Sequence, residues 1–167
     1  MTGLEPLPGV VLEWGGAHRR DFPWRHTRDP WEVLVAEVML QRTGTDRVSS
    51  YWSRFLTRFP TPAACASAPL SEVIVEWTGL GYNRRALNLH RCAVALVERH
   101  GGQVPENLED LLALPGVGAY TARALLVFAL ERDVGVVDTN VGRVLARWSG
   151  ESLTPSRAQD LADRSVP

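Results

Sequence analysis

The sequence predicts an all-α protein, and three observations support that fold class. Apolar residues recur at the spacing of a helix face along most of the chain. No convincing pair of alternating strands is present. Proline and glycine fall where such helices begin and end: Asp29 and Pro30 open one helix, and Gly101 closes the longest. Together these patterns predict a bundle of about nine short helices.

The expected helices follow one another with short connections. The first surrounds residues Pro8 to Ala17, and the Pro- and Arg-rich stretch HRRDFPWRHTRDP connects it to the next. The later helical patterns lie at 31–43, 47–59, 61–68, 70–80, 83–100, 108–114, 119–131, 139–149 and 156–163. A chain of 167 residues has room for one compact domain or two small lobes with a sizeable core.

Composition excludes several classes of protein. No apolar run approaches the span of a bilayer and the N-terminus lacks a basic-then-apolar signal pattern, so we expect a cytoplasmic protein. Cys65 and Cys92 lie far apart in helix-like stretches, without the spacing of a disulfide framework, a zinc site or an iron–sulfur site, which favours buried, inert thiols. The net charge of −1 gives no global basic signature for nucleic acid, and all 18 basic residues are arginine.

The stretch LEDLLALPGVGAYTARALL is typical of a helix, a tight hairpin and a second helix. Pro115 ends the first helix, while Gly116 and Gly118 permit backbone conformations that a side chain resists. The second helix would start with unpaired N–H groups and the positive end of its dipole. From the residues alone, a plain turn between packed helices and a phosphate-binding backbone remain open alternatives.

Glu37 stands in an otherwise apolar stretch. Between Trp31 and Leu40 only Glu32 and Glu37 are polar, and on a helix Glu37 shares a face with Leu40 and Gln41. A carboxyl group among apolar neighbours is partly desolvated, which raises its pKa toward a value useful for a general acid. The alternative is a polar stripe at the edge of the helix.

Asp138 follows a short apolar run and precedes a helix in VGVVDTNVGRVLAR. The position is typical of an N-cap, and a carboxylate there is also able to face a cavity and stabilise a developing cation. Asn140 would either cap the helix or orient a water molecule or a DNA group. Two carboxylates in different environments are the arrangement that cleaves bonds to a sugar carbon: one protonates the leaving group and the other stabilises the oxocarbenium-like centre.

These stretches together resemble the helix-hairpin-helix DNA glycosylases, the superfamily of endonuclease III and the A/G-specific adenine glycosylases. The match runs from about Phe22 to Trp148 and is carried by FPWR, DPWEVLVAEVMLQRT, WTGLGYNRRALNLH, ALPGVGAYTARA and VVDTNVGRVLAR. The resemblance implies two α-helical lobes with an active-site cleft between them, into which the target nucleotide flips. One lobe of about six helices, containing the hairpin, would span 30–134, and 1–29 with 135–167 would form a second, incomplete lobe.

The resemblance also implies roles for individual residues. Glu37 matches the acid of the adenine glycosylases, which protonates the base and assists attack by water, and Asp138 matches the aspartate that stabilises the sugar cation. Asn140 matches the family asparagine two places on, and Tyr82 matches an aromatic wedge in the base stack. The implied DNA-contacting residues are Leu114, Gly116, Val117, Gly118, Gln41, Arg42, Thr43 and Tyr82, with Trp24 and Arg25 in the base pocket. The implied partner is double-stranded DNA with a mismatched or oxidised base pair, bound by a monomer at the bacterial nucleoid.

Tyr120 occupies the place where bifunctional relatives carry a lysine that attacks the sugar and then cuts the strand. A tyrosine cannot form a Schiff base, and the chain contains no lysine that would replace it. We therefore expect a monofunctional glycosylase that hydrolyses the N-glycosidic bond of adenine mispaired with 8-oxoguanine or guanine.

Two departures from the family pattern leave other functions open. Arg42 stands where adenine glycosylases usually have a glutamine, and LQRT together with Tyr120 also resembles the mismatch glycosylases that remove thymine or uracil opposite guanine. Family members usually continue into a four-cysteine loop that binds a 4Fe–4S cluster, and adenine glycosylases commonly add a domain that reads 8-oxoguanine. We expect both to be missing here, with no cofactor bound by the residues present, and the chain to be truncated. A further alternative is a DNA-binding fragment without catalysis.

Overall fold

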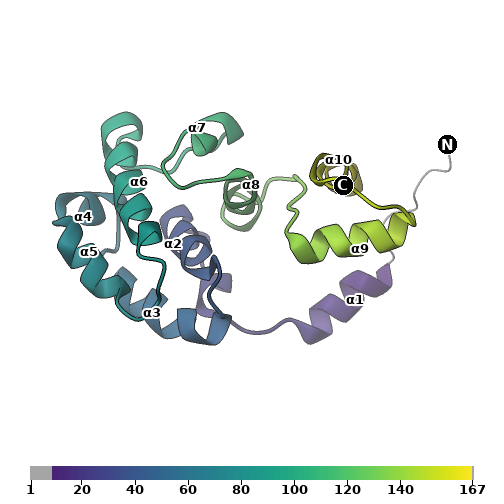
Figure 1. The fold of residues 1–167 in the computed structure, drawn as a ribbon, viewed down its shortest axis with the longest axis horizontal. Helices are drawn as coiled ribbons and strands as arrows, with labels where there is room; N and C mark the ends of the chain where they lie inside the picture. Colours follow the sequence, from purple (N-terminus) through teal and green to yellow (C-terminus); the bar gives the residue numbers. More distant parts are fainter. Residues whose placement is uncertain (1–8, 167) are drawn as a thin grey trace. The chain divides into compact units, whose positions relative to one another are not determined.

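The computed structural model describes residues 9–166, and these form ten α-helices and one 3-10 helix without a strand (Figure 1). The expected all-α class is confirmed, and the ten α-helices correspond to the first expected helix and the nine later helical patterns. The first helix is α1 (Gly9–His18), and Pro8, which the sequence analysis included in it, lies outside the described residues. None of the described helices is long and apolar enough to cross a membrane.

The remaining helices follow in chain order. They are the 3-10 helix η1 (Pro23–Arg25), α2 (Pro30–Leu40), α3 (Thr45–Arg58), α4 (Pro62–Ser67), α5 (Leu70–Trp77), α6 (Arg84–His100), α7 (Leu108–Leu112), α8 (Ala119–Phe128), α9 (Thr139–Ser149) and α10 (Pro155–Ser165).

The contacts divide the chain into two units. The large unit spans 22–131, and the described part of the small unit comprises 9–21 and 132–166. Residues 22–29, which the sequence analysis assigned to the second lobe, belong to the large unit, where η1 contacts α2. The large unit has seven α-helices, α2 to α8, where about six were expected, and the extended residues Ala68 and Pro69 separate α4 from α5.

Side chains at the helix ends explain several boundaries. Asp29 accepts hydrogen bonds from the backbone N–H groups of Trp31 and Glu32, at 2.8 and 3.2 Å, and so starts α2. Asn107 caps α7 by accepting from the third residue of that helix, at 2.9 Å. The longest helix, α6, ends at Gly101, whose φ of 61° is the left-handed conformation that glycine adopts most readily.

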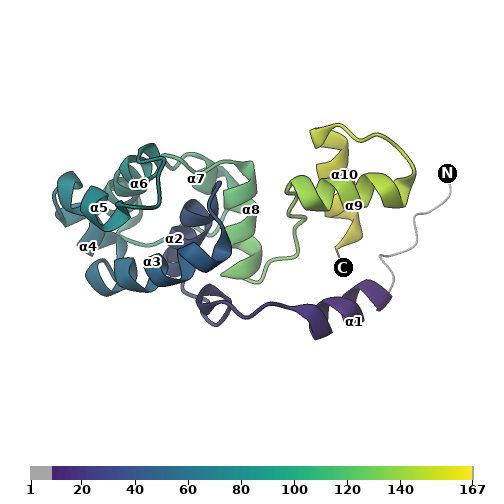
Figure 2. The same ribbon diagram turned by 60° about the horizontal axis from the view of Figure 1, so that its bottom comes forward.

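Helix α2 runs through the middle of the large unit, in contact with α3, α6 and α8 (Figures 1 and 2). Eight of its eleven residues are buried, including Glu37. A helix that is buried on nearly all sides has no solvated face for a polar residue to occupy. Glu37 therefore lies among apolar neighbours rather than on a polar edge stripe.

Several helices are shorter than their apolar patterns predict, and α2 and α8 are two of them. Helix α2 stops at Leu40 instead of residue 43, because the guanidinium of Arg85 binds the carbonyl oxygen of Gln41 at 2.5 Å and Arg42 has a φ of 58°. Helix α8 stops at Phe128 instead of residue 131: the N–H groups of Ala129 and Leu130 both donate to the carbonyl oxygen of Leu125, at 3.0 and 3.2 Å, and Glu131 has a φ of 52°. The Arg28 guanidinium binds the carbonyl oxygen of Phe128 at 3.3 Å. Side chains distant in the sequence thus bind carbonyl oxygens at the two helix ends.

In the small unit, α10 packs against the segment that leads into α9. Gly135 makes the closest approach: a Cβ atom at this position would lie 2.7 Å from the backbone carbon of Ala162. The Gly135 N–H donates to Asp163 Oδ1 at 2.9 Å, and the Gly135 carbonyl accepts from Gln159 Nε2 at 2.9 Å. Helix α10 therefore fixes the backbone three residues before Asp138.

Candidate active site

Glu37 is a buried acid in the large unit. Its side chain lies on α2, is 7% exposed and receives a hydrogen bond from the hydroxyl of Tyr120, in the first turn of α8. Burial raises the pKa of Glu37 from 4.5 to about 7, and the hydrogen bond from Tyr120 acts in the opposite direction. Near neutral pH this carboxyl group is therefore present in both protonation states, as a general acid requires.

Asp138 is the N-cap of α9 in the small unit. Its Oδ1 atom accepts hydrogen bonds from the N–H groups of Asn140 and Val141, at 2.9 and 2.7 Å. The side-chain amide of Asn140 donates to Oδ2 at 3.3 Å and in turn accepts a hydrogen bond from Arg143. The N-cap role expected for Asp138 is thus present, and Asn140 orients its second oxygen.

The predicted hairpin joins α7 to α8. Gly116 has a φ of 79°, and a Cβ atom there would lie 2.7 Å from the Cβ of Asn88 in α6. Gly118 is the N-cap of α8, and no side chain caps that helix. The side chains of Leu114 and Val117, two of the predicted DNA contacts, are buried, so these residues offer their backbone only.

Two turns of the large unit present the other predicted DNA contacts. Arg42, in the turn after α2, and Tyr82, in the turn before α6, both have positive φ, at 58° and 50°. The Arg42 guanidinium lies 5.9 Å from the centre of the Tyr82 ring, within cation–π distance. Tyr82 is 60% exposed, whereas Gln41 and Thr43 are half-buried beside Arg42.

Trp24 and Arg25 lie on η1. The Trp24 ring stacks on Phe22 at 5.0 Å and meets Trp52 edge-on at 6.3 Å, and the Arg25 guanidinium lies 5.6 Å from the centre of the Phe22 ring. Both residues are half-buried on the segment that contacts α2, the helix that carries Glu37. Their aromatic packing holds η1 in place.

A model of the HhH-GPD superfamily of base excision DNA repair proteins matches residues 35–165. This chain belongs to that superfamily. The resemblance drawn from the sequence motifs is confirmed.

The relatives in the HhH-GPD superfamily include adenine DNA glycosylases and a thymine/uracil-DNA glycosylase. An adenine DNA glycosylase of Mycolicibacterium smegmatis is 46% identical over 92% of this chain and 53% of its own length. A thymine/uracil-DNA glycosylase of Methanothermobacter thermautotrophicus is 36% identical over 86% of this chain and 65% of its own length. The solved structure of a thermostable thymine-DNA glycosylase has a TM-score of 0.88 at 32% identity, covering 95% of this chain and 76% of that chain. The chain spans about half the length of the adenine glycosylases that it matches.

The cysteines of this HhH-GPD chain do not fit the 4Fe–4S cluster that the resemblance implies for longer members. Cys65 in α4 and Cys92 in α6 are buried free thiols, and burial raises the pKa of each to about 12. Cluster ligands are thiolates, which such burial disfavours. Within residues 9–166, no group of three or more His, Cys, Asp or Glu side chains is placed to hold a metal ion.

Arg85, beside the predicted DNA contacts, was not predicted from the sequence. Arg85 is 8% exposed, and its guanidinium binds carbonyl oxygens of both turns, including those of Gln41 and Gly81. A signal was present in the sequence, because Arg85 shares the apolar face of α6 with Leu89 and Cys92. A charged residue on a buried helix face needs partners.

Proposed function

We propose that this protein is a monofunctional DNA N-glycosylase that hydrolyses the N-glycosidic bond of adenine mispaired with 8-oxoguanine or guanine. The observation that carries the proposal is the buried Glu37, whose pKa of about 7 suits an acid that works at neutral pH. The adenine DNA glycosylase of M. smegmatis, at 46% identity, supports adenine as the base.

In the proposed reaction, protonated Glu37 gives its proton to the adenine ring as the bond between the base nitrogen and the sugar C1′ breaks. The base then leaves as a neutral molecule, and the positive charge remains on the sugar. Asp138 stabilises that cation as a carboxylate until water adds to C1′ and loses a proton, which leaves an abasic site. Asn140 keeps the Asp138 side chain in place through its hydrogen bond to Oδ2.

The proposal assigns the remaining predicted residues to DNA binding by a monomer. The backbone of Gly116 and Gly118, at the uncapped start of α8, would bind one phosphate, because exposed N–H groups and the helix dipole attract an anion there. Tyr82, with Gln41, Arg42 and Thr43 beside it, would occupy the space left by the flipped base. Trp24 and Arg25 would line the pocket for that base.

Tyr120 accounts for the monofunctional part of the proposal. It hydrogen-bonds Glu37 from the first turn of α8 but carries no amine, and the sequence contains no lysine. Without a side-chain amine, no Schiff base to the sugar forms and the strand is not cut by that route.

The second candidate is a glycosylase for thymine or uracil opposite guanine. Arg42 in LQRT and the 36% identical thymine/uracil-DNA glycosylase of M. thermautotrophicus favour it. The experiment that separates the candidates is a single-turnover assay on four duplexes, containing A·8-oxoguanine, A·G, T·G or U·G. We expect release of adenine from the first two duplexes. Base release from T·G and U·G alone would support the second candidate. Release from none of the four would indicate a DNA-binding fragment.

A further inference from the structure

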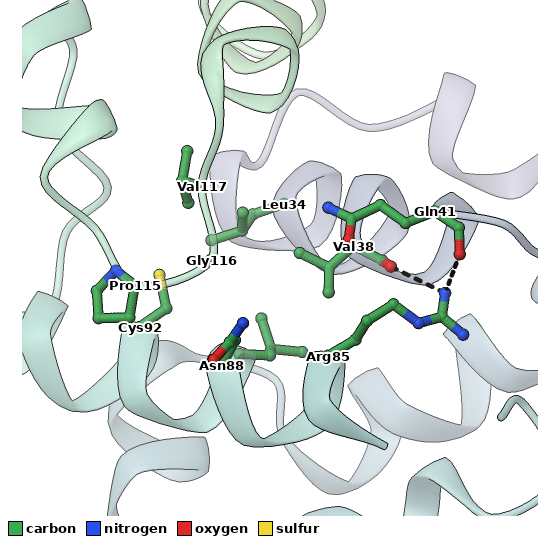
Figure 3. Close-up of a pocket in the computed structure, with 10 residues that line it drawn as sticks. Leu34, Val38, Gln41, Arg85, Asn88, Cys92, Pro115, Gly116 and Val117 are labelled. Carbon is green, nitrogen blue, oxygen red and sulfur yellow. Dashed lines mark hydrogen bonds between the residues drawn. The ribbon is translucent and has the colours of Figure 1, made fainter. Parts of the chain in front are cut away.

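Arg85 connects the two turns that present the proposed DNA contacts. On the side of α2, its Nη1 atom donates to the carbonyl oxygens of Met39 and Gln41, at 2.7 and 2.5 Å, and Nη2 donates to the hydroxyl of Thr43 at 3.0 Å. Figure 3 shows the Arg85 side chain extending from α6 to the carbonyl oxygens of Val38 and Gln41, at the C-terminal end of α2. The turn that follows α2 is therefore tied to α6 at several points.

The same guanidinium binds the turn before α6. Its Nη2 atom donates to the carbonyl oxygens of Leu80 and Gly81, at 3.2 and 3.0 Å. The Arg85 guanidinium also lies 5.4 Å from the centre of the Trp77 ring and 5.5 Å from that of Tyr82. One side chain thus holds the backbone on both sides of the Arg42–Tyr82 pair.

The two turns need such support because of their backbone conformations. Arg42 and Tyr82 both have the left-handed conformation that non-glycine residues adopt only when their surroundings maintain it. Arg85 is well suited to maintain them, because its planar fork presents several donors in fixed directions. A lysine ammonium at this position would be a single point of contact and would not reach both turns.

Burial indicates that this arrangement is built into the fold. Arg85 is 8% exposed, desolvation lowers its pKa, and its described hydrogen-bond partners are carbonyl oxygens and one hydroxyl. The buried charge is therefore stabilised by several oriented oxygen acceptors rather than by a single opposite charge. Loss of the guanidinium leaves several carbonyl oxygens without their donor.

We propose that Arg85 is a positioning residue that joins the turn after α2 and the turn before α6 into one element, so that Arg42 and Tyr82 are held as a pair before DNA arrives. The structural part of this inference stands without the proposed function. Its consequence for DNA binding rests on that function.

The first test measures amide hydrogen exchange in the free protein. Arg85→Lys should speed exchange in residues 39–43 and 79–83 by about tenfold, the loss of roughly one net charge-assisted hydrogen bond. The matched control is Arg58→Lys, which changes an exposed arginine that pairs with Glu72 in the same unit. Unchanged exchange in both turns of folded Arg85→Lys would overturn the proposal.

A milder variant tests the connection if Arg85→Lys does not fold. Thr43→Val keeps Arg85 and removes one acceptor of its guanidinium, in the turn after α2. Thr43 lies outside residues 79–83. If Arg85 joins the turns, amide exchange should nevertheless become faster in residues 79–83. A change confined to residues 39–43 would contradict the proposal.

The DNA consequence is tested with a double-mutant cycle. The probe is a fluorescent duplex with one A·8-oxoguanine pair, bound by proteins that also carry Glu37→Gln to prevent turnover. We expect Arg85→Lys to weaken binding much less once Tyr82→Ala is present, because both changes remove the same positioned side chain. If the two substitutions reduce the DNA affinity by independent factors, the proposed coupling is overturned. Loosened turns with unchanged binding by all variants would instead contradict the proposed DNA role of Tyr82, and leave the positioning role of Arg85 intact.

Discussion

The hydroxyl of Tyr120 donates a hydrogen bond to the carboxyl group of Glu37, and this bond opposes the effect of burial on the acid. Burial is the larger effect, so the pKa of Glu37 is about 7 rather than 4.5. The two residues come from α2 and α8, which pack together in the large unit. The acidity of Glu37 is therefore set mainly by its burial on α2 and is adjusted by a contact from α8.

Tyr120→Phe should raise the pKa of Glu37 further, because it removes the group that favours the carboxylate. If Glu37 is the general acid, it acts only in its protonated form, so base release by the native protein should decline as the pH rises through about 7. In the variant this decline should move to higher pH. The measurement is the pH profile of the single-turnover rate, and a decline that stays in place or moves down would rule out the assignment.

Glu37→Gln should stabilise the protein at alkaline pH. A glutamate with a pKa of about 7 in the folded state and 4.5 when exposed stabilises the fold fully below pH 4.5, and that contribution is lost as the pH rises through 7. The difference corresponds to about 3 kcal/mol in the free energy of unfolding. The free energy of unfolding is measured by urea melts of both proteins at pH 4.5 and pH 8. Relative to the native protein, the variant should be more stable at pH 8 than at pH 4.5.

The same variant should release no base while still binding DNA, because the amide group of glutamine is too weak an acid to protonate the leaving group. Its affinity for a duplex with A·8-oxoguanine is measured by fluorescence anisotropy, and its activity by single-turnover base release. Turnover equal to that of the native protein would remove Glu37 from the role of general acid.

Tyr120→Lys should introduce strand cleavage. The new amine would lie in the first turn of α8, beside Glu37, where we expect it to attack the sugar C1′ as the base leaves and form a Schiff base. Borohydride reduction should then trap the variant on DNA, and the native protein, which has no lysine, should not be trapped. A trapped native protein would show that it is not monofunctional.

The hairpin glycines should differ in their contribution to stability. Gly116→Ala puts a Cβ atom 2.7 Å from Asn88 Cβ at a φ of 79°, and we expect it to cost about 1–3 kcal/mol. Gly118→Ala meets nothing within 4 Å at a φ of −97° and should change stability by no more than about 0.5 kcal/mol. If the backbone of Gly118 approaches a phosphate, its substitution should still weaken DNA binding, and normal binding by Gly118→Ala would contradict that contact.

Helical periodicity and capping residues were sufficient to predict the all-α class and most helix positions. Asp29 starts α2 as the sequence analysis expected, and the apolar neighbours of Glu37 indicated its burial. Those features depend on residues within a few positions of one another.

The ends of α2 and α8 were not predictable in the same way. Near both ends one residue has a positive φ, Arg42 or Glu131, and an arginine from a distant part of the chain, Arg85 or Arg28, binds a carbonyl oxygen. The pairing of Arg42 with Tyr82 also needs two turns that lie some 40 residues apart in the sequence to meet in the fold. A pattern of apolar residues does not contain such long-range contacts.

The small unit offers a test of how α10 supports Asp138. Gly135→Ala places a Cβ atom 2.7 Å from the backbone of Ala162 and should destabilise this unit by about 1–3 kcal/mol, because backbone cannot move aside as a flexible side chain does. Gly142→Ala, within α9, is the matched control: its nearest neighbour would be Val137 at 3.8 Å, and alanine is favoured over glycine in a helix by roughly 0.5–1 kcal/mol. The two changes should therefore shift the thermal midpoint in opposite directions. If Asp138 stabilises the sugar cation, Gly135→Ala should also slow single-turnover base release more than it weakens DNA binding, because the segment it displaces leads directly to that carboxylate. An equal midpoint for both variants would show that α10 does not pack on Gly135 as described.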